Sequence, residues 1–252
     1  MTERVAVTGR DLRTLLGIVS DDRSDLPADG LPLSLLTELV GQIRCEKLSF
    51  FGLDSSQREL WFGQTLPDEG DVDDQPFWAH YEDSACSYPD RSADLRAVTK
   101  LSDFYSARQW HSTGMYSDYG RAVGMEHELL LCLPAGPGPS AGPGRSVRLM
   151  LIRGRGPDFT PRDRALLALL RPHLQQAYRD AERRRHGIPA LTPRQWDLLA
   201  LVAAGHSNAQ IARRLGLSLG TVRKHLENIY ARLQVQSRTA ALARAFPDRT
   251  AP

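Results

Sequence analysis

Residues 191–246 read LTPRQWDLLALVAAGHSNAQIARRLGLSLGTVRKHLENIYARLQVQSRTAALARAF, and this segment determines how the chain is organised. It contains four helix starts, each with a hydroxyl residue at the N-cap and two with a glutamine three residues later. The caps are, in order, Thr192 with Gln195, Ser207 with Gln210, Ser218, and Ser237. Apolar residues follow each cap at helical spacing, so the segment predicts a domain of four helices.

Small residues mark the junctions between these helices. Gly205 offers a left-handed stop after the first helix, and Gly216 stands where a tight inter-helix turn requires positive φ. Ala212 is small where two helices must approach closely. The inner face of the third helix consists of Val222, Leu226, Ile229 and Leu233. Two closely packed helices joined by a short turn form a helix-turn-helix.

The third helix leaves Arg223, Lys224, Glu227 and Asn228 on its outer face, at positions i, i+1, i+4 and i+5. In a major groove, Arg and Lys donate to guanine and Asn pairs with adenine. Ser218, Thr221 and the helix N-terminus suit phosphate oxygens. The alternative is a solvated helix face on which Arg223 pairs with Glu227. The residues of the turn and the charge of the segment together favour a DNA-binding helix over a merely solvated one.

The charge of the chain is divided unevenly. Residues 190–252 hold nine Lys or Arg against three Asp or Glu, whereas residues 1–189 hold twenty-three against twenty-seven. The net charge of +2 therefore conceals a basic C-terminal module attached to an acidic body. Such asymmetry is typical of a module that binds phosphate groups.

The same segment resembles the C-terminal DNA-binding domain of LuxR/FixJ-type regulators. The motifs that carry the resemblance are Leu191–Arg194, Gly205–Asn208, Ile211-Ala212, Thr221-Val222, His225-Leu226 and Ser237–Ala240. The resemblance implies that the third helix enters the major groove, where Arg223 and Lys224 read bases or backbone, and that the fourth helix makes a dimer contact. We add Ser207, Asn208 and Arg238, which lie within these motifs, to the DNA-contacting candidates.

The remaining sequence predicts an α+β sensor domain. Helices are expected at Asp11–Val19, Leu33–Ile43, Phe77–Tyr81 and Leu101–Trp110, a β-hairpin at Lys47–Leu53 and Glu59–Gly63, and strands at Glu128–Leu133 and Val147–Ile152. The Gly/Pro-rich segment between the last two strands is expected to be a mobile loop. The architecture is similar to GAF or PAS domains, as in the sensor halves of actinobacterial LuxR-type regulators. We predict domains at 1–182 and 190–252, with a linker at 183–189.

Aromatic residues supply the candidate ligand site. Thirteen of the eighteen lie between Phe50 and Tyr119. A pocket for a small, partly apolar molecule uses such side chains, and the alternative is an ordinary aromatic core. The candidate ligand-binding residues are Trp61, Phe77, Trp78, Tyr81, Tyr105, Trp110 and Tyr116. The stretch WAHYEDSACSYPD resembles the set with which LuxR-type receptors bind acyl-homoserine lactones, but its Pro89-Asp90 order is reversed, so a lactone is not predicted.

A long helix beginning at Thr160-Pro161 is expected to link the two domains. Its apolar residues recur at heptad spacing: Leu167, Leu170, Leu174, Ala177 and Ala181. This stripe serves either as a dimer seam or as a face that packs on the chain's own sheet. Pro172 interrupts the helix and is expected to kink it. Ala181–Ile188, which contains the run Arg183–Arg185, is expected to lead into the DNA-binding module as a basic hinge.

Other classes of function find little support. The chain has no apolar run long enough to span a bilayer and no signal-peptide pattern, and its three cysteines suit a reducing compartment, so we expect a cytoplasmic protein. Hydrolase, phosphate-loop and zinc-protease motifs are missing, so no enzyme activity and no cofactor are expected. A metal site would have to gather His80, Cys86, His111, His127 and Cys132, whose spacing is irregular. A phosphorylated receiver domain would need paired acids at the end of its first strand and a lysine on its fifth. In this sequence no apolar strand ends in acids near residue 10, and Lys is nearly absent.

The sequence therefore predicts a homodimeric regulator that senses a small molecule or a partner. It should bind double-stranded promoter DNA at an imperfect palindrome and act on RNA polymerase. Two alternatives remain: a DNA binder regulated by protein without a ligand, and a subunit of RNA polymerase similar to a sigma factor.

Overall fold

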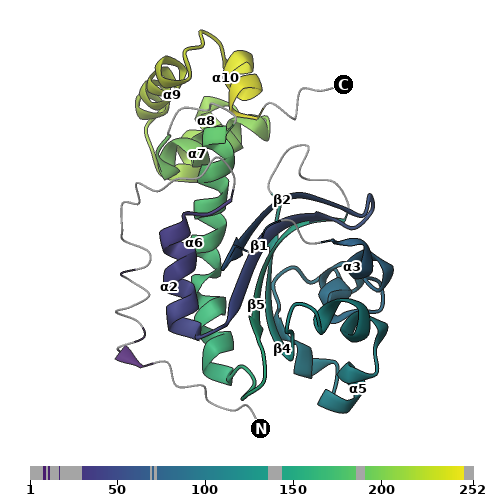
Figure 1. Cartoon of the computed structure of the whole chain (residues 1–252). Coiled ribbons are helices and arrows are strands. Elements are labelled where there is room, and N and C mark those ends of the chain that lie inside the picture. The colour runs from purple at the N-terminus through teal and green to yellow at the C-terminus, as the bar shows by residue number, and fades with distance from the viewer. Residues whose placement is uncertain are drawn as a thin grey trace. The chain divides into compact units, whose positions relative to one another are not determined.

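The computed structural model describes residues 30–68, 70, 73–135, 144–185 and 191–246, together with Thr8, Gly9, Asp11 and Gly17. These residues fall into two compact units, one holding the described residues up to Ala181 and the other those from Glu182 onward. The first unit combines a sheet with helices, and the second consists of helices (Figure 1). The predicted α+β domain followed by a helical domain is thus confirmed, while its narrower GAF or PAS type remains a prediction.

The first unit contains a five-stranded antiparallel sheet. Its strands are β1 (Lys47–Asp54), β2 (Glu59–Leu66), β3 (Val98–Lys100), β4 (His127–Pro134) and β5 (Arg145–Arg153), in the spatial order β2-β1-β5-β4-β3. The predicted hairpin is β1 with β2, and the two predicted apolar strands pair as β4 with β5. The sheet also joins two segments distant in sequence, because β5 pairs along the whole of β1.

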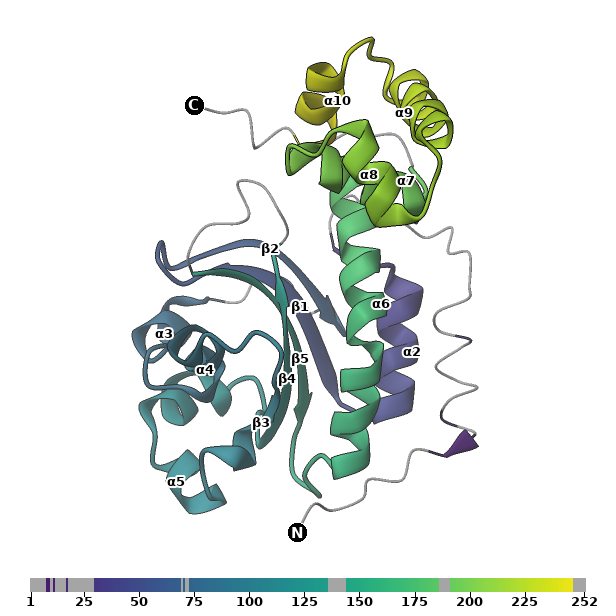
Figure 2. The ribbon, with the colours of Figure 1, turned by 180° about the vertical axis from the view of Figure 1, so that it is seen from behind.

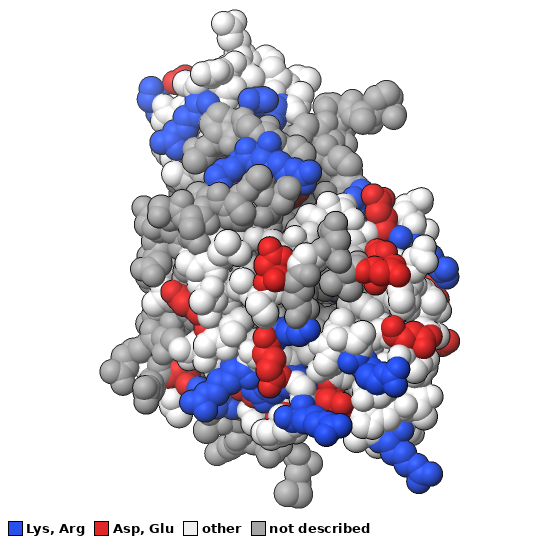
Figure 3. All heavy atoms as spheres, in the orientation of Figure 1, with Lys and Arg blue, Asp and Glu red and all other residues white. Residues whose placement is uncertain are grey.

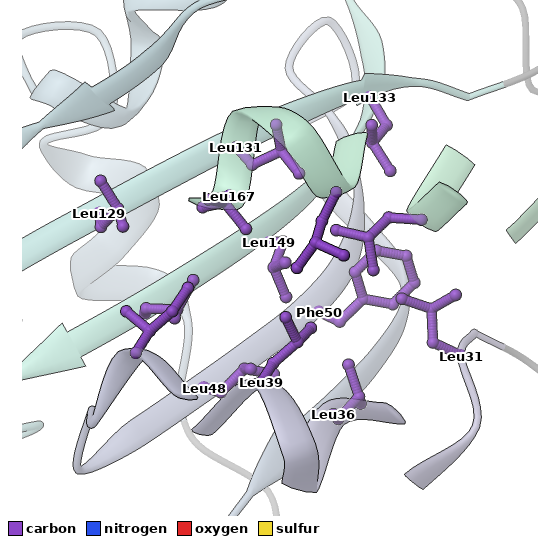
Figure 4. Packing of buried hydrophobic residues seen from close by; sticks show 14 of the residues in the cluster. Leu31, Leu36, Leu39, Leu48, Phe50, Leu129, Leu131, Leu133, Leu149 and Leu167 are labelled. Carbon is purple, nitrogen blue, oxygen red and sulfur yellow. The ribbon is translucent and has the colours of Figure 1, made fainter. Parts of the chain in front are cut away.

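Helices α2 (Leu33–Ile43) and α6 (Pro161–Arg185) cover one face of the sheet (Figures 1 and 2). Leucines of β4 and β5 alternate toward these helices, and Leu36, Leu39 and Leu167 meet them from the helix side (Figure 4). Each of these three leucines is fully buried. At about 25 cal/mol per Å² of apolar surface, a fully buried leucine stabilises the fold by about 2 kcal/mol. This layer therefore supplies much of the domain's stability.

The apolar stripe of α6 belongs to this core. Leu167, Leu170 and Leu174 are at most 2% exposed and pack with the strands of the same chain. Of the two roles predicted for the stripe, packing on the chain's own sheet is the one observed. Because these leucines are already buried, the alternative that they form a dimer seam is wrong. Helix α6 also continues through Pro172, so the predicted interruption is wrong. Burial on both sides of Pro172 offsets the one backbone hydrogen bond that the proline removes.

Short helices cover the opposite face of the sheet (Figure 2). They are α3 (Gln75–Ala79), α4 (Tyr88–Ser92) and α5 (Ala107–His111), with single turns at Ala85–Ser87, Leu101–Asp103 and Tyr116–Gly120. The helix predicted across Leu101–Trp110 is wrong in extent, because Ser106 starts a new helix. Its hydroxyl accepts a hydrogen bond from the backbone N–H of Gln109, whose side chain accepts one from the backbone N–H of Ser106.

The second unit contains the four predicted helices, α7 (Pro193–Ala203), α8 (Asn208–Leu215), α9 (Leu219–Leu233) and α10 (Arg238–Ala245). All four hydroxyl caps form, each accepting a backbone hydrogen bond from the residue three positions later. Gly216 adopts φ +63° at the end of α8, as the turn requires. The predicted inner residues of α9 are buried with those of α7 and α8 in one core.

Two predictions lie mostly outside the described residues: the helix Asp11–Val19 and the Gly/Pro-rich loop between β4 and β5. The predicted hinge at 181–188 is described only as far as Arg185, and up to there the chain continues as helix α6, so a hinge in this part is wrong. Among the helices that are described, none combines the length and the apolar character needed to cross a membrane.

Candidate nucleic-acid interface and ligand cavity

The outer face of α9 presents the four residues predicted from helical spacing. Arg223, Lys224, Glu227 and Asn228 are all exposed, whereas Val222 and its inner-face companions are buried. This separation follows from 3.6 residues per turn, which places positions i, i+1, i+4 and i+5 on one side of a helix. The stripe therefore offers two cations, one carboxylate and one amide to a binding partner.

The ion pair within this stripe joins Lys224, and not Arg223, to Glu227. The Nζ atom of Lys224 lies 3.6 Å from Oε2 of Glu227, and both side chains are more than 60% exposed. The alternative interpretation, in which Arg223 pairs with Glu227, is therefore wrong about the partner of Glu227. A surface pair of this kind contributes at most about 1 kcal/mol, so a phosphate or a base can compete for Lys224.

The N-terminus of α9 carries the two hydroxyl candidates. Oγ of Ser218 accepts a hydrogen bond of 3.0 Å from the backbone N–H of Thr221, and the two hydroxyl oxygens lie 2.8 Å apart. Both residues are exposed at the positive end of a fifteen-residue helix. The remaining N–H groups of the first turn point outward from this end, an arrangement that suits an anion.

The structure brings together two candidates that the sequence leaves apart. Arg238 at the start of α10 donates from Nη1 to Oδ1 of Asn208, at 3.2 Å, and from Nη2 to the carbonyl oxygen of His206, at 2.5 Å. Asn208 begins α8, so this guanidinium links the starts of two helices. Ser207 beside it is exposed and caps α8. Arg238 thus has a structural role within the unit.

Basic side chains gather over the helical unit, where acidic ones are sparse (Figure 3). Arg213 and Arg214 on α8 are exposed, as are Arg223 and Lys224 on α9. This distribution agrees with the charge asymmetry of the sequence. A positive surface of this kind attracts polyanions over a distance of about one Debye length.

Only part of the aromatic candidate set faces a cavity. A hollow of about 650 Å³ lies beside β1 and β2, and Trp61 and Phe77 are the two candidates that line it. Phe51, Phe62 and Tyr119 also line it; they lie in the aromatic-rich stretch of the sequence but outside the candidate set. Met150, which lines it as well, was not predicted. Phe51 and Met150 belong to the core under the short helices, whereas Trp61 and Phe62 on the edge strand β2 pack against the core under α2 and α6, so sequence spacing alone does not show that they line one cavity.

Trp78, Tyr81 and Trp110 belong to an aromatic core under the short helices and are at most 8% exposed. Both indole N–H groups are satisfied, that of Trp78 by Oδ2 of Asp74 at 3.0 Å and that of Trp110 by the carbonyl oxygen of Met125 at 2.9 Å. These three residues therefore fit the alternative reading of an aromatic core.

The hydroxyls of the two remaining candidates are also engaged. Tyr105 donates to the carbonyl oxygen of Asp83 at 2.6 Å. Tyr116 donates to Oε1 of Glu126 at 3.1 Å. Both contacts fasten loop segments of the same domain, so neither hydroxyl is aimed at the large cavity.

Sequence reasoning missed a buried polar network on the same face of the sheet. Arg148 on β5 is completely buried and donates from Nη2 to the hydroxyl oxygen of Tyr81 at 3.0 Å and to Oδ1 of Asp90 at 3.1 Å. Its Nη1 donates to the carbonyl oxygen of Cys86. The Tyr81 hydroxyl donates to Oδ2 of Asp90 at 2.5 Å. Burial raises the pKa of the Tyr81 phenol and raises that of the Cys86 thiol to about 12, so both stay protonated.

The residues of the metal alternative do not converge. Nε2 of His80 lies 2.8 Å from Oδ2 of Asp118, and Nε2 of His111 lies 2.6 Å from Oε2 of Glu126. His127 contacts the carbonyl oxygen of Gly156 at 3.0 Å. In the part of the chain that the structure describes, no three His, Cys, Asp or Glu side chains form a group that could hold a metal ion.

Residues 189–245 match the family model described as bacterial regulatory proteins, luxR family. The helical unit is a LuxR-family helix-turn-helix domain. This LuxR-family domain is 48% identical over 54 residues to the HTH-type transcriptional regulator YhjB of Escherichia coli, covering 21% of this chain and 27% of that protein. It is part of an 89-residue match, 35% identical, to the monoamine regulon transcriptional regulator of Klebsiella aerogenes, covering 35% of this chain and 39% of that protein.

The matched segments span about a quarter to two fifths of the length of these relatives, so they concern the LuxR-family domain and little else. Across 94% of this chain, the structure is similar to that of Escherichia coli SdiA, with 97% of that chain covered, 16% identity and a TM-score of 0.39. A score below 0.5 does not establish a shared fold, so neither fold nor ligand is transferred from it.

Proposed function

We propose that this chain is a transcription regulator that binds double-stranded promoter DNA through α9. The observation that carries the proposal is the exposed stripe Arg223, Lys224, Glu227 and Asn228 on the third helix of a LuxR-family helix-turn-helix. Arg223 and Lys224 contact bases or phosphates, and Asn228 reads a base edge. Ser218, Thr221 and the N-terminus of α9 hold a backbone phosphate.

The protein acts as a homodimer on two related half-sites, which form an imperfect palindrome. Residues 1–182 form the sensor domain, residues 183–189 the linker and residues 190–252 the DNA-binding domain. A five-stranded antiparallel sheet with helices on both faces suits a GAF or PAS type of sensor. The cavity of about 650 Å³ supports a small-molecule effector, because pockets of ~300–1,000 Å³ accommodate such ligands. Bound at the promoter, the dimer changes the activity of RNA polymerase.

A mobility-shift titration tests the DNA interface. The full-length protein is titrated against a duplex from the region upstream of its own gene, beside the double variant Arg223→Ala/Lys224→Ala. We expect the variant to bind at least about tenfold more weakly. The slope of the logarithm of the binding constant against the logarithm of the salt concentration should fall by the amount that corresponds to about one or two lost phosphate contacts. The matched control is Arg96→Ala/Arg108→Ala, which removes two exposed cations from the sheet domain.

Equal binding by the wild type and the α9 variant would refute α9 as the reading helix. If the control variant loses as much affinity as the α9 variant, only overall charge matters and the specific interface is wrong. Sedimentation of the complex measures the stoichiometry, and one protomer per duplex would refute the dimer. A wild type that binds fully, with no response to any small molecule, would favour regulation by a protein partner.

A further inference from the structure

Glu128 is a buried acid in the middle of the sheet domain. It lies on β4 opposite Ile152 of β5 and is 4% exposed. Within the described residues, no hydrogen bond or ion pair reaches its carboxylate. Buried carboxylates are normally hydrogen-bonded, since desolvation without a partner is costly. Its carboxylate is therefore free to contact a group that the described chain does not supply.

The carboxylate lines a small cavity under the short helices. About 10 Å³ is open there, room for roughly one water-sized group. Aromatic and sulfur-containing side chains form most of its wall: Phe77, Trp110, Met115, Tyr119, Met125 and Met150. The described wall includes no Lys, Arg or His. Aromatic faces attract cations, and methionine sulfur is polarisable, so such a wall accepts a positively charged group.

Arg148, the cation among the described residues whose charge acts on Glu128, already has an acidic partner. Arg148 is paired with Asp90 at 3.1 Å and makes three further hydrogen bonds to Tyr81, Ser146 and the Cys86 carbonyl. The charge of Arg148 lowers the pKa of Glu128, but burial outweighs it and raises that pKa to about 7. An ionised Glu128 thus adds a negative charge that the domain itself leaves without a bonded partner.

We propose that Glu128 recognises the ammonium group of an elongated, otherwise apolar amine. This inference rests on the proposed sensing function and names the chemical class of its effector. The small cavity holds only the head group. The body of the amine occupies the cavity of about 650 Å³, because Phe77, Tyr119 and Met150 line both spaces and form the wall between them. For one molecule to occupy both spaces, Phe77, Tyr119 or Met150 has to change its rotamer.

Two linear probes of equal length isolate the head group. Full-length protein is titrated at about pH 7.5 with n-octylamine and with 1-octanol, and binding is measured by calorimetry and by tryptophan fluorescence, to which Trp110 in the wall of the small cavity contributes. A charge-assisted hydrogen bond at a buried site predicts a preference of about tenfold to hundredfold for the amine. Glu128→Gln should bring the two affinities to within about twofold, a loss of the charged contact with shape conserved.

Glu59→Gln is the matched control, because Glu59 is exposed at the start of β2 and lines neither cavity. It should keep the wild-type preference for the amine. Equal affinity of the wild type for both probes, or no binding of either, would overturn the inference without using any variant. So would a Glu128→Gln protein with native circular dichroism that still prefers the amine. The DNA titration is done without probe, so failure here leaves the proposed DNA binding intact.

Discussion

Replacing Glu128 by Gln should change how the stability of the sheet domain depends on pH. Burial raises the pKa of Glu128 from its ordinary value of 4.5 to about 7 in the folded chain. Above pH 4.5 the unfolded chain releases this proton while the folded chain keeps it. The contribution of Glu128 to the free energy of unfolding therefore falls as pH rises from 4.5 to about 7 and then levels off.

The size of the effect follows from the two pKa values. One pH unit corresponds to 1.36 kcal/mol, so the interval from 4.5 to about 7 corresponds to about 3 kcal/mol. Glutamine has the same shape and no proton to lose. The difference in stability between Glu128→Gln and the wild type should therefore shift by about 3 kcal/mol in favour of the variant between about pH 4.5 and 8.

Urea denaturation at several pH values measures this difference. The Trp196→Phe background removes the one tryptophan of the helix-turn-helix unit, so the remaining fluorescence reports on the sheet domain. Taking the difference cancels the titrating groups that do not interact with Glu128. Glu59→Gln is the control and should show a difference that does not vary with pH. A flat difference for Glu128→Gln would mean that the carboxyl titrates normally and would refute the reasoning.

Two further predictions concern a buried ion pair and a turn. Asp90→Asn leaves the buried guanidinium of Arg148 without its counter-charge and should lower the free energy of unfolding of the sheet domain by about 3 kcal/mol. Urea denaturation measures this loss, and a loss below about 1 kcal/mol would contradict a structural role for the pair. Gly216→Ala should destabilise the helix-turn-helix unit by about 1 kcal/mol because φ is +63°, whereas Gly220→Ala, within α9 and with no crowding at Cβ, should stabilise it by up to about 1 kcal/mol. Thermal unfolding followed by circular dichroism tests this pair, and shifts of the same sign would contradict it.

The helix-turn-helix unit could be predicted almost completely because the contacts that define its helix ends are local in sequence. Each helix start is set by a hydroxyl and the backbone N–H three residues later, as at Ser207 and Ser218. The turn after α8 needs only one residue with positive φ, and Gly216 provides it. Short-range contacts of this kind are present in the sequence itself, so no tertiary information was needed.

Helix α6 shows where such reasoning stops. An apolar stripe at heptad spacing has the same pattern whether it faces a second protomer or a sheet. Leu167 and Leu174 are buried because β1 and β5 bring leucines and phenylalanines beneath them. The pairing of β5 with β1 joins residues about one hundred positions apart, and that contact is not written in any local pattern.

The buried charges Arg148 and Glu128 were missed although both residues stand out in the sequence. Arg148 interrupts the apolar run from Val147 to Ile152, and Glu128 begins another apolar run. A charged residue within a strand is usually read as its solvent-facing position. Here both faces of the sheet are covered by helices, so the same residues are buried. Recognising that required knowing that the short helices pack on the second face.

Because side chains alternate along each strand, the two faces of the sheet carry different residues. In β4, Leu129, Leu131 and Leu133 point to the layer of α2 and α6, while Glu128, Leu130 and Cys132 point to the short helices. The register pairs Cys132 with Arg148 and Glu128 with Ile152, which places both charged residues on that second face. The layer of α2 and α6 is therefore an apolar core, and the polar chemistry lies across the sheet from it. Conservative substitutions at Glu128 should change ligand recognition while this leucine layer, which stabilises the domain, remains intact.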